Sequence, residues 1–132
     1  MSFLIDTDIC SAYLKGNRIV WNRFMQFTGG LHISAITLAE LNVWAQRAGA
    51  PKSRLESLQA LLNDLIFLEV DVDVAQRYGH LQALLLDQGK PAPGMDLVIA
   101  ATALVHNLTL VTHNTQDFIN IPGLRIADWL VP

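Results

Sequence analysis

Short apolar runs alternate with longer stretches of helical periodicity along the chain. Runs rich in apolar and β-branched residues predict strands at 3–5, 31–34, 66–70 and 108–112, with a short further strand at 125–127. Apolar residues spaced three or four apart predict helices at 8–15, 18–27, 37–48, 73–88 and 96–106, and another that begins at Pro51. This alternation predicts an α/β domain with a mainly parallel sheet of four or five strands and helices on both faces.

Size and composition indicate one domain. A chain of 132 residues, 52% of them hydrophobic, can form one core but not two, so we expect residues 1–132 to be a single unit. The longest apolar stretches are too short for a bilayer or are interrupted by Asn63 and Asp64. Cys10 is the only cysteine, so no disulfide can form within the chain, and a reducing cytoplasm is the expected location.

The net charge of −3 at first argues against a nucleic-acid partner, because phosphate binding usually needs excess Lys and Arg. However, the chain has 12 acidic and 9 basic residues. If four acids gather around a metal ion, the rest of the surface becomes slightly positive. RNA is therefore compatible with this composition.

Acidic residues follow the predicted strands at the places where α/β sheets bind ligands. Asp6 ends the first strand, Glu40 lies early in the helix after the second, and Asp117 follows the fourth by a short loop. Asp96 begins the buried helix just before that fourth strand. Ligands of open α/β sheets collect at the carboxyl ends of the strands. We therefore expect these four carboxylates to lie together.

Each acid also has a purely structural interpretation. Asp6 could cap the first helix, although Asp8 is the better candidate for that cap. Glu40 forms a capping-box pattern with Thr37. Asp96 at a helix start is favoured by the helix dipole, and Asp117 could be a solvated turn residue.

Taken together, the four acids favour a metal site. Two carboxylates about 5 Å apart repel by roughly 3 kcal/mol at an effective dielectric constant near 20, and several such pairs are too costly for an ordinary domain. A divalent cation removes this repulsion. Oxygen ligands select Mg²⁺ or Mn²⁺, and no Cys or His spacing in the sequence supports zinc.

Four motifs in order resemble the PIN-domain ribonucleases, and among them the VapC-type toxins of toxin–antitoxin pairs. The resemblance spans nearly the whole chain. The motifs are Phe-Leu-Ile-Asp6-Thr-Asp-Ile, Ile-Ser-Ala-Ile-Thr37-Leu-Ala-Glu40-Leu, Met-Asp96-Leu-Val-Ile-Ala-Ala-Thr-Ala-Leu and Leu-Val-Thr112-His-Asn114-Thr-Gln-Asp117-Phe118. One departure is Gly94-Met95 before Asp96, where a residue such as proline is expected nearer the acid.

The resemblance implies a PIN-like three-layer α/β/α fold and a metal-dependent endoribonuclease. Asp6, Glu40 and Asp96 would hold the Mg²⁺ or Mn²⁺ ion, with Asp117 as the fourth acid. Thr112 and Asn114 would be polar neighbours of the acids or of metal-bound water, and either Asp117 or Asn114 could face the ion. The resemblance also implies a small antitoxin partner and a homodimer.

Basic and aromatic residues supply further hypotheses. Candidate phosphate-binding residues follow the first two acids, although they would also suit solvated helix faces; they are Lys15, Arg18, Arg23, Arg47, Lys52 and Arg54. An aromatic set is expected to be mostly core, with part of it lining a groove for a partner helix; its members are Trp21, Phe24, Phe27 and Trp44.

Two other functions remain open. Asp6-Thr7-Asp8 after an apolar strand is similar to the nucleophile motif of haloacid-dehalogenase-like phosphatases, although the acidic pair expected later in that family is missing near Thr112. Alternatively, the chain is a non-catalytic PIN module that binds RNA or protein. Nothing in the sequence reads a 2′-hydroxyl, so DNA cleavage also stays open.

Overall fold

The predicted α/β architecture is confirmed by the computed structural model, which describes residues 1–131. The predicted single unit, 1–132, extends one residue beyond that range. The strands are β1 (Phe3–Ile5), β2 (Leu31–Ser34), β3 (Ile66–Leu68), β4 (Thr109–Val111) and β5 (Ile126–Ala127). The α-helices are α1 (Thr7–Leu14), α2 (Arg18–Gln26), α3 (Ala35–Gln46), α4 (Lys52–Asn63), α5 (Val72–Asp87) and α6 (Gly94–Val105).

The five strands form one parallel sheet with the order β3-β2-β1-β4-β5. β1 is central and pairs with β2 on one side and β4 on the other, in the register Phe3 with Leu31 and Thr109. The strand order therefore changes direction at β1 and β4. A crevice at the carboxyl ends of two such strands is the usual ligand site of an open α/β sheet.

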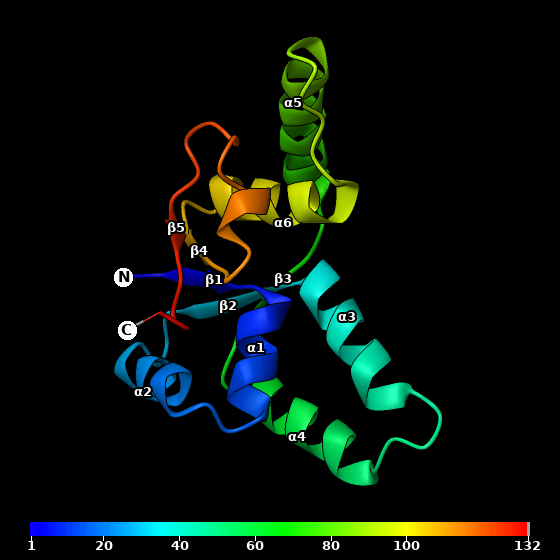
Figure 1. Cartoon of the computed structure of the whole chain (residues 1–132), viewed down its shortest axis with the longest axis vertical. Coiled ribbons are helices and arrows are strands. Elements are labelled where there is room, and N and C mark those ends of the chain that lie inside the picture. Colours follow the sequence, from blue (N-terminus) through cyan, green and yellow to red (C-terminus); the bar gives the residue numbers. More distant parts are fainter. Residues whose placement is uncertain (132) are drawn as a thin grey trace.

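Helices cover both faces of the sheet and complete the three layers (Figure 1). Alternate residues of β1 face opposite layers: Phe3 and Ile5 pack with α1 to α4, whereas Leu4 packs with α5 and α6. β1 is buried on both faces, so it is apolar throughout. In residues 1–131, none of the helices has both the length and the hydrophobicity needed to cross a membrane.

The boundaries of several predicted elements were wrong. Helix α1 starts at Thr7, because Asp6 rather than Asp8 is its N-cap and accepts a hydrogen bond from the Thr7 backbone N–H. Helix α3 starts at Ala35, because Ser34 caps it through the Thr37 N–H. Helix α6 starts two residues before Asp96, at Gly94. Strand β3 ends at Leu68 rather than at residue 70.

Candidate active site

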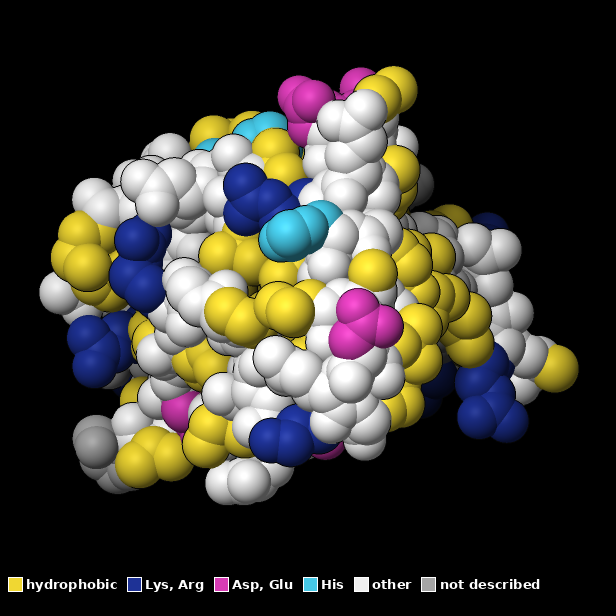
Figure 2. Space-filling model, turned by 90° about the horizontal axis from the view of Figure 1, so that it is seen from above, with side chains coloured by type: hydrophobic (Ala, Val, Ile, Leu, Met, Phe, Trp, Pro, Cys, Tyr) yellow, Lys and Arg dark blue, Asp and Glu magenta, His cyan; other side chains and the backbone are white. Residues whose placement is uncertain are grey.

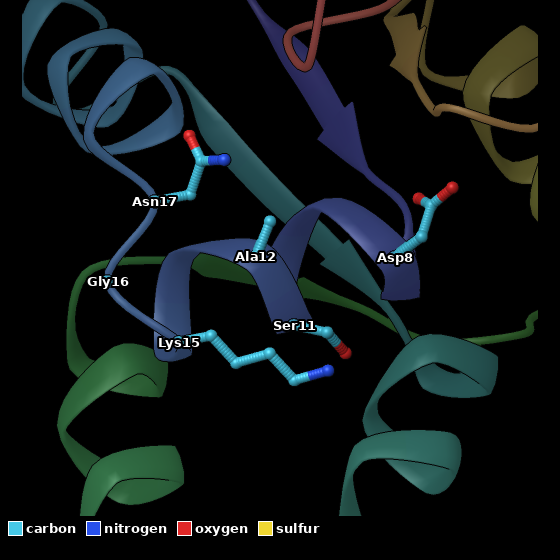
Figure 3. A pocket seen from close by; sticks show the side chains of 6 residues that line it. All are labelled: Asp8, Ser11, Ala12, Lys15, Gly16 and Asn17. Atoms are coloured by element: carbon cyan, nitrogen blue, oxygen red, sulfur yellow. The ribbon is translucent and has the colours of Figure 1, made fainter.

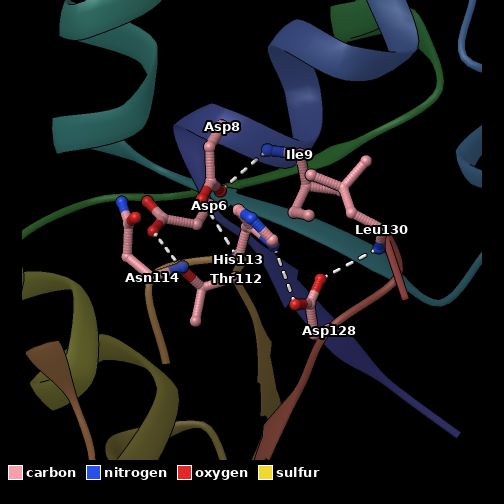
Figure 4. A network of polar contacts seen from close by, with 8 residues as sticks. All are labelled: Asp6, Asp8, Ile9, Thr112, His113, Asn114, Asp128 and Leu130. Carbon is pink, nitrogen blue, oxygen red and sulfur yellow. Dashed lines mark hydrogen bonds and ion pairs between the residues drawn. The ribbon is translucent and has the colours of Figure 1, made fainter. Parts of the chain in front are cut away.

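Asp6 lies at the centre of the candidate site, directly after β1 where the strand order changes direction. Only 6% of its surface is exposed. Asp6 Oδ1 accepts the Thr7 N–H at 2.8 Å. Its Oδ2 accepts the Thr112 hydroxyl at 2.8 Å (Figure 4). The Thr112 hydroxyl oxygen also accepts the Asn114 N–H at 3.1 Å. These bonds join the end of β1 to the loop after β4 and fix the Asp6 carboxylate.

Glu40 faces this centre from helix α3. Its Oε1 accepts the hydroxyl of Thr7 at 2.6 Å. The capping-box interpretation of Glu40 was wrong, because Ser34 makes the cap and Glu40 lies one turn further along the helix. Thr7 therefore connects two of the predicted acids, since its N–H binds Asp6 and its hydroxyl binds Glu40.

Asp96 and Asp117 approach from the other layer and from the loop after β4. Asp96 is in the first turn of α6, and Asp117 ends the short 3-10 helix η1 (Thr115–Asp117). The pKa of Asp96 is raised, first by burial and then by the negative charges of Asp117, Glu40 and Asp8. Such repulsion is largely screened when charges lie more than about 10 Å apart. The structure thus brings all four predicted acids into one electrostatic cluster.

A family comparison identifies the domain. The model of the PIN domain matches residues 3–124. This chain belongs to the PIN-domain family. VapC of Shigella flexneri, described as a tRNA(fMet)-specific endonuclease, is 33% identical over 130 residues, with 98% of each chain covered. Ribonuclease VapC2 of Haemophilus influenzae strain Rd is 30% identical over 131 residues, covering 98% of this chain and 99% of that protein.

Solved structures of similar fold belong to the same group. The DNA-bound VapBC structure of Salmonella typhimurium superposes with a TM-score of 0.91 and 34% identity, covering 98% of both chains. VapBC2 of Rickettsia felis, bound to a promoter DNA fragment, superposes with a TM-score of 0.90 and 28% identity, covering 98% of this chain and 99% of that one. This PIN domain therefore lies in the VapC branch, and these matches favour the PIN family over the dehalogenase-like alternative.

The PIN domain also contains a fifth acid, Asp8, that sequence reasoning missed. Its Oδ2 accepts the His113 backbone N–H at 2.9 Å, and its Oδ1 accepts the Ile9 N–H at 2.8 Å. Burial raises its pKa, and its own charge raises the pKa of Asp6. The sequence favours Asp8 as the cap of the first helix, a role that Asp6 takes in the structure. Two acids separated by one residue after a buried strand were the available signal.

Burial is the main reason why the pKa of Asp6 is raised to about 6, with the charges of Asp8 and Glu40 adding to it. The hydrogen bonds from Thr7 and Thr112 oppose this rise, because they stabilise the ionised form. At neutral pH the folded PIN domain therefore holds an ionised carboxylate in an unfavourable environment. A cation beside Asp6 would remove much of that cost.

The chemistry of the cluster fits a hard divalent cation. Every candidate ligand is a carboxylate oxygen, which Mg²⁺ and Mn²⁺ prefer. Within residues 1–131, no three acidic, His or Cys side chains are close enough together to hold an ion by direct contact alone. Mg²⁺ usually keeps several of its waters and is bound by one or two carboxylates directly. An ion bound in this way would contact one or two of these carboxylates, and the remaining acids would reach it through water.

The predicted basic residues are spread around the PIN domain. In the face shown in Figure 2, Lys and Arg side chains form separate small groups rather than one stripe. Lys15 lines a hollow of about 610 Å³ together with Asp8, Ser11 and Asn17 (Figure 3). Arg18 lies over the Trp21 ring at 5.8 Å, and Arg23 contacts Gln26 on its own helix. Arg47 lines a second hollow at the end of α3.

The aromatic set is mostly core, as predicted. Phe24 is 2% exposed, and Phe27 stacks on Trp129 with ring centroids 5.7 Å apart. Trp44 is half-buried beneath Arg54, whose guanidinium lies 5.1 Å from the ring. Trp21 differs, since 42% of it is exposed on α2.

Proposed function

We propose that this PIN domain is a metal-dependent endoribonuclease and acts as the toxin of a toxin–antitoxin pair. The observation that carries the proposal is the group of carboxylates around Asp6, at the sheet position where α/β proteins bind ligands. Relatives that match over nearly their full length are described as ribonucleases and a tRNA endonuclease, which supports RNA as the substrate.

Mg²⁺ or Mn²⁺ is the proposed cofactor. Asp6, Glu40 and Asp96 would hold it, with Asp117 completing the set and Asp8 near it. Thr112 and Asn114 would act behind these ligands, since the Thr112 hydroxyl donates to Asp6 and the Asn114 N–H donates to the Thr112 hydroxyl oxygen. When bound, the ion supplies the positive charge that phosphodiester hydrolysis requires.

The chain's own residues orient the reacting groups. Thr112 and Thr7 fix Asp6 and Glu40, and the His113 N–H fixes Asp8. The carboxylates then orient a water molecule for in-line attack on phosphorus. Water loses a proton as its oxygen bonds to phosphorus, the P–O3′ bond breaks, and the 3′ oxygen takes up that proton. The products are a 5′-phosphate and a 3′-hydroxyl, and no histidine is needed as nucleophile.

The RNA backbone is proposed to run along α1 beside the carboxylates. Lys15 and Asp8 border the same hollow, so a phosphate bound by Lys15 would lie in a hollow that reaches the cluster at Asp8, at the other end of α1 (Figure 3). Arg18 follows this hollow in the chain, and Arg23 and Arg47 would add weaker contacts further away. These cations give affinity but little sequence preference, because they contact phosphate.

A small antitoxin and a second copy of the chain are the proposed protein partners. The solved relatives are toxin–antitoxin complexes, some of them bound to DNA. Exposed apolar side chains on α2, namely Ile19, Trp21 and Met25, supply a surface that a partner helix could cover. The cytoplasm is the proposed location, because it holds RNA and keeps the buried thiol of Cys10 reduced.

Cleavage of RNA by the purified chain tests the proposed function. With Mg²⁺ or Mn²⁺, the wild type should produce fragments with 5′-phosphates, whereas EDTA or Asp96→Asn should lower the rate at least about 100-fold, since several kcal/mol of charge stabilisation are lost. Asp87→Asn, an exposed acid at the end of α5, is the matched control and should cut normally. Equal cutting by Asp96→Asn would contradict the proposal, and metal binding without cutting would favour the non-catalytic module.

A further inference from the structure

A further hollow, distinct from those lined by Lys15 and Arg47, borders the acid cluster on the side of Asp117. It has a volume of about 210 Å³ and lies between the loop that joins α5 to α6 and the segment around η1. Lys90, Pro91 and Pro93 line it from the loop, and Gln116 and Asn120 line it from the other wall, next to Asp117. Ligand pockets for drug-sized molecules start near 300 Å³, so this space suits a smaller group.

Hydrogen bonds hold the loop wall of this hollow in place. The Gln82 side chain on α5 binds the backbone of Ala92 twice, since its amide nitrogen donates to the carbonyl at 2.9 Å and its oxygen accepts the N–H at 3.2 Å. The Lys90 N–H donates to the carbonyl of Leu85 at 2.8 Å. Pro91 and Pro93 restrict the backbone further. The wall therefore keeps its shape without a ligand.

The opposite wall is anchored in the core. Phe118 is 1% exposed and Ile121 is 5% exposed, so the segment 116–121 is fixed at two points. The Ile121 N–H donates to the Phe118 carbonyl at 3.1 Å. Both walls are thus preorganised, which lowers the entropy that binding would cost.

Three polar side chains in this hollow are available to a ligand. Among residues 1–131, Lys90, Gln116 and Asn120 make no side-chain hydrogen bond, and all three are exposed. Each amide has two donors and an acceptor, the groups that read the edge of a nucleobase. The exposed rings of Pro91 and Pro93 supply an apolar surface for the flat face of a base. Lys90 adds a cation for an adjoining phosphate.

The position of the hollow connects it with the proposed cleavage. Asp117 borders it, and the charge of Asp117 is the largest charge effect raising the pKa of Asp96. The hollow that Lys15 lines meets the cluster elsewhere, at Asp8, and there the Asn17 side-chain oxygen already accepts the Val20 N–H. The smaller hollow is therefore the better equipped of the two to distinguish bases.

We propose that this hollow binds one unstacked base of single-stranded RNA beside the cleaved phosphate, and that Gln116 and Asn120 select that base. Lys90 holds a neighbouring phosphate. Sequence-specific RNA recognition relies on bases of single-stranded segments whose edges are free for hydrogen bonds. The inference rests on the proposed nuclease function and adds to it the residues that determine where the RNA is cut.

Cleavage of a random pool of short single-stranded RNAs, followed by sequencing of the ends, tests this inference. The wild type should prefer one base at a fixed position beside the cut. Gln116→Ala combined with Asn120→Ala should reduce that preference about tenfold while cutting continues, because the amides read the base but do not perform the chemistry. Lys90→Ala should weaken binding of all sequences equally. Gln59→Ala, an exposed amide on α4, should change nothing.

The outcomes separate this inference from the proposed function. If the wild type cuts RNA and the double variant keeps the same base preference, the base site is wrong and the nuclease stands. If the wild type cuts nothing, fluorescence anisotropy measures its affinity for A-, C- and U-homopolymers instead. A preference for one homopolymer that is lost in the double variant supports the base site. No cutting and no base-dependent binding overturn both. If Gln116→Ala and Asn120→Ala weaken the binding of a protein partner and leave the base preference unchanged, the base site is also overturned.

Discussion

Asp6 is a buried carboxylate, and keeping it ionised costs free energy. The carboxylate is almost completely covered, yet its position at the end of β1 surrounds it with other acids. Two hydrogen bonds reduce this cost without removing it, because the pKa stays raised at about 6. An acid that only stabilised the fold would not be expected in such a place. Its environment fits a role in binding a cation.

Asp6→Asn should stabilise the metal-free protein while removing its activity. The pKa of Asp6 rises from 3.8 to about 6 on folding, so the unfolded chain binds fewer protons between these pH values. The free energy of unfolding of the wild type therefore falls as pH rises from about 4 to 6, by up to about 3 kcal/mol. The asparagine variant has no titrating group at this position, so its free energy of unfolding does not fall in this way. Urea unfolding in EDTA at pH 7 should therefore give a higher free energy of unfolding for Asp6→Asn than for the wild type.

The same experiment at pH 4 is its own control. There Asp6 is protonated in the wild type, so the two proteins should have similar free energies of unfolding. Asp87→Asn, which changes an exposed acid, should match the wild type at both pH values. An Asp6→Asn protein that is less stable than the wild type at pH 7 in EDTA would mean that the charged carboxylate supports the fold.

At the scale of elements, polar residues between strand and helix were the hardest features to predict. Ser34 and Thr37 both suit an N-cap, and only the tertiary position of α3 decides that Ser34 makes it. That choice frees Glu40 to bind Thr7. The presence of the strands and the order of the elements were easier to predict, because runs of apolar residues indicate burial directly. The exact ends depended on caps, which compete over two or three residues.

The C-terminal segment contacts the loop after β4, which carries Thr112 and His113, through one pair of side chains. His113 Nδ1 donates to Asp128 Oδ2 at 2.9 Å, and Asp128 Oδ1 accepts the Leu130 N–H at 2.9 Å (Figure 4). The His113 N–H meanwhile holds Asp8. Sequence reasoning missed this pair, because the partners are 15 residues apart and neither belongs to a recognisable local pattern.

Breaking this pair should slow cleavage more than it destabilises the fold. The His113 side chain is 56% exposed, so the pair contributes at most about 1 kcal/mol to the free energy of unfolding. Asp128→Ala and His113→Ala should each lower kcat/KM about fivefold, because the loop that orients Asp8 becomes looser, and the double variant should be no worse than either. Steady-state kinetics of all four proteins measure this coupling.

Arg125→Ala is the matched control for that cycle. Arg125 also binds the C-terminal segment to the β4 region, through the Asn107 carbonyl at 2.9 Å, but at the opposite end of the strand from Asp8. It should lower the unfolding midpoint without changing kcat/KM. Equal losses of activity in Arg125→Ala and Asp128→Ala would mean that the His113 pair has only a general structural role.

At the scale of the whole molecule, the parallel sheet explains why distant acids meet. The Asp6–Thr112 bond joins residues 106 positions apart, and it exists because β1 and β4 are neighbours. The parallel sheet could be predicted from the sequence, and so could the positions of Asp6, Glu40 and Asp117 after its strands and of Asp96 at the start of α6. Their spacing, the participation of Asp8 and the two bordering hollows could not, because these depend on how α1, α3 and α6 pack.

A divalent cation should therefore stabilise the entire fold, not only the site. If Mg²⁺ binds with a Kd on the order of 1 mM, 10 mM adds about 1.4 kcal/mol to the free energy of unfolding and raises Tm by roughly 5 °C. NaCl of equal ionic strength should raise it much less, because screening acts weakly on buried charges. Asp96→Asn should abolish the rise caused by Mg²⁺, whereas Asp87→Asn should keep it. Thermal unfolding of the three proteins provides the measurement. A rise of the same size in Asp96→Asn would place the cation away from the cluster, and the carboxylates would then need another explanation for their closeness.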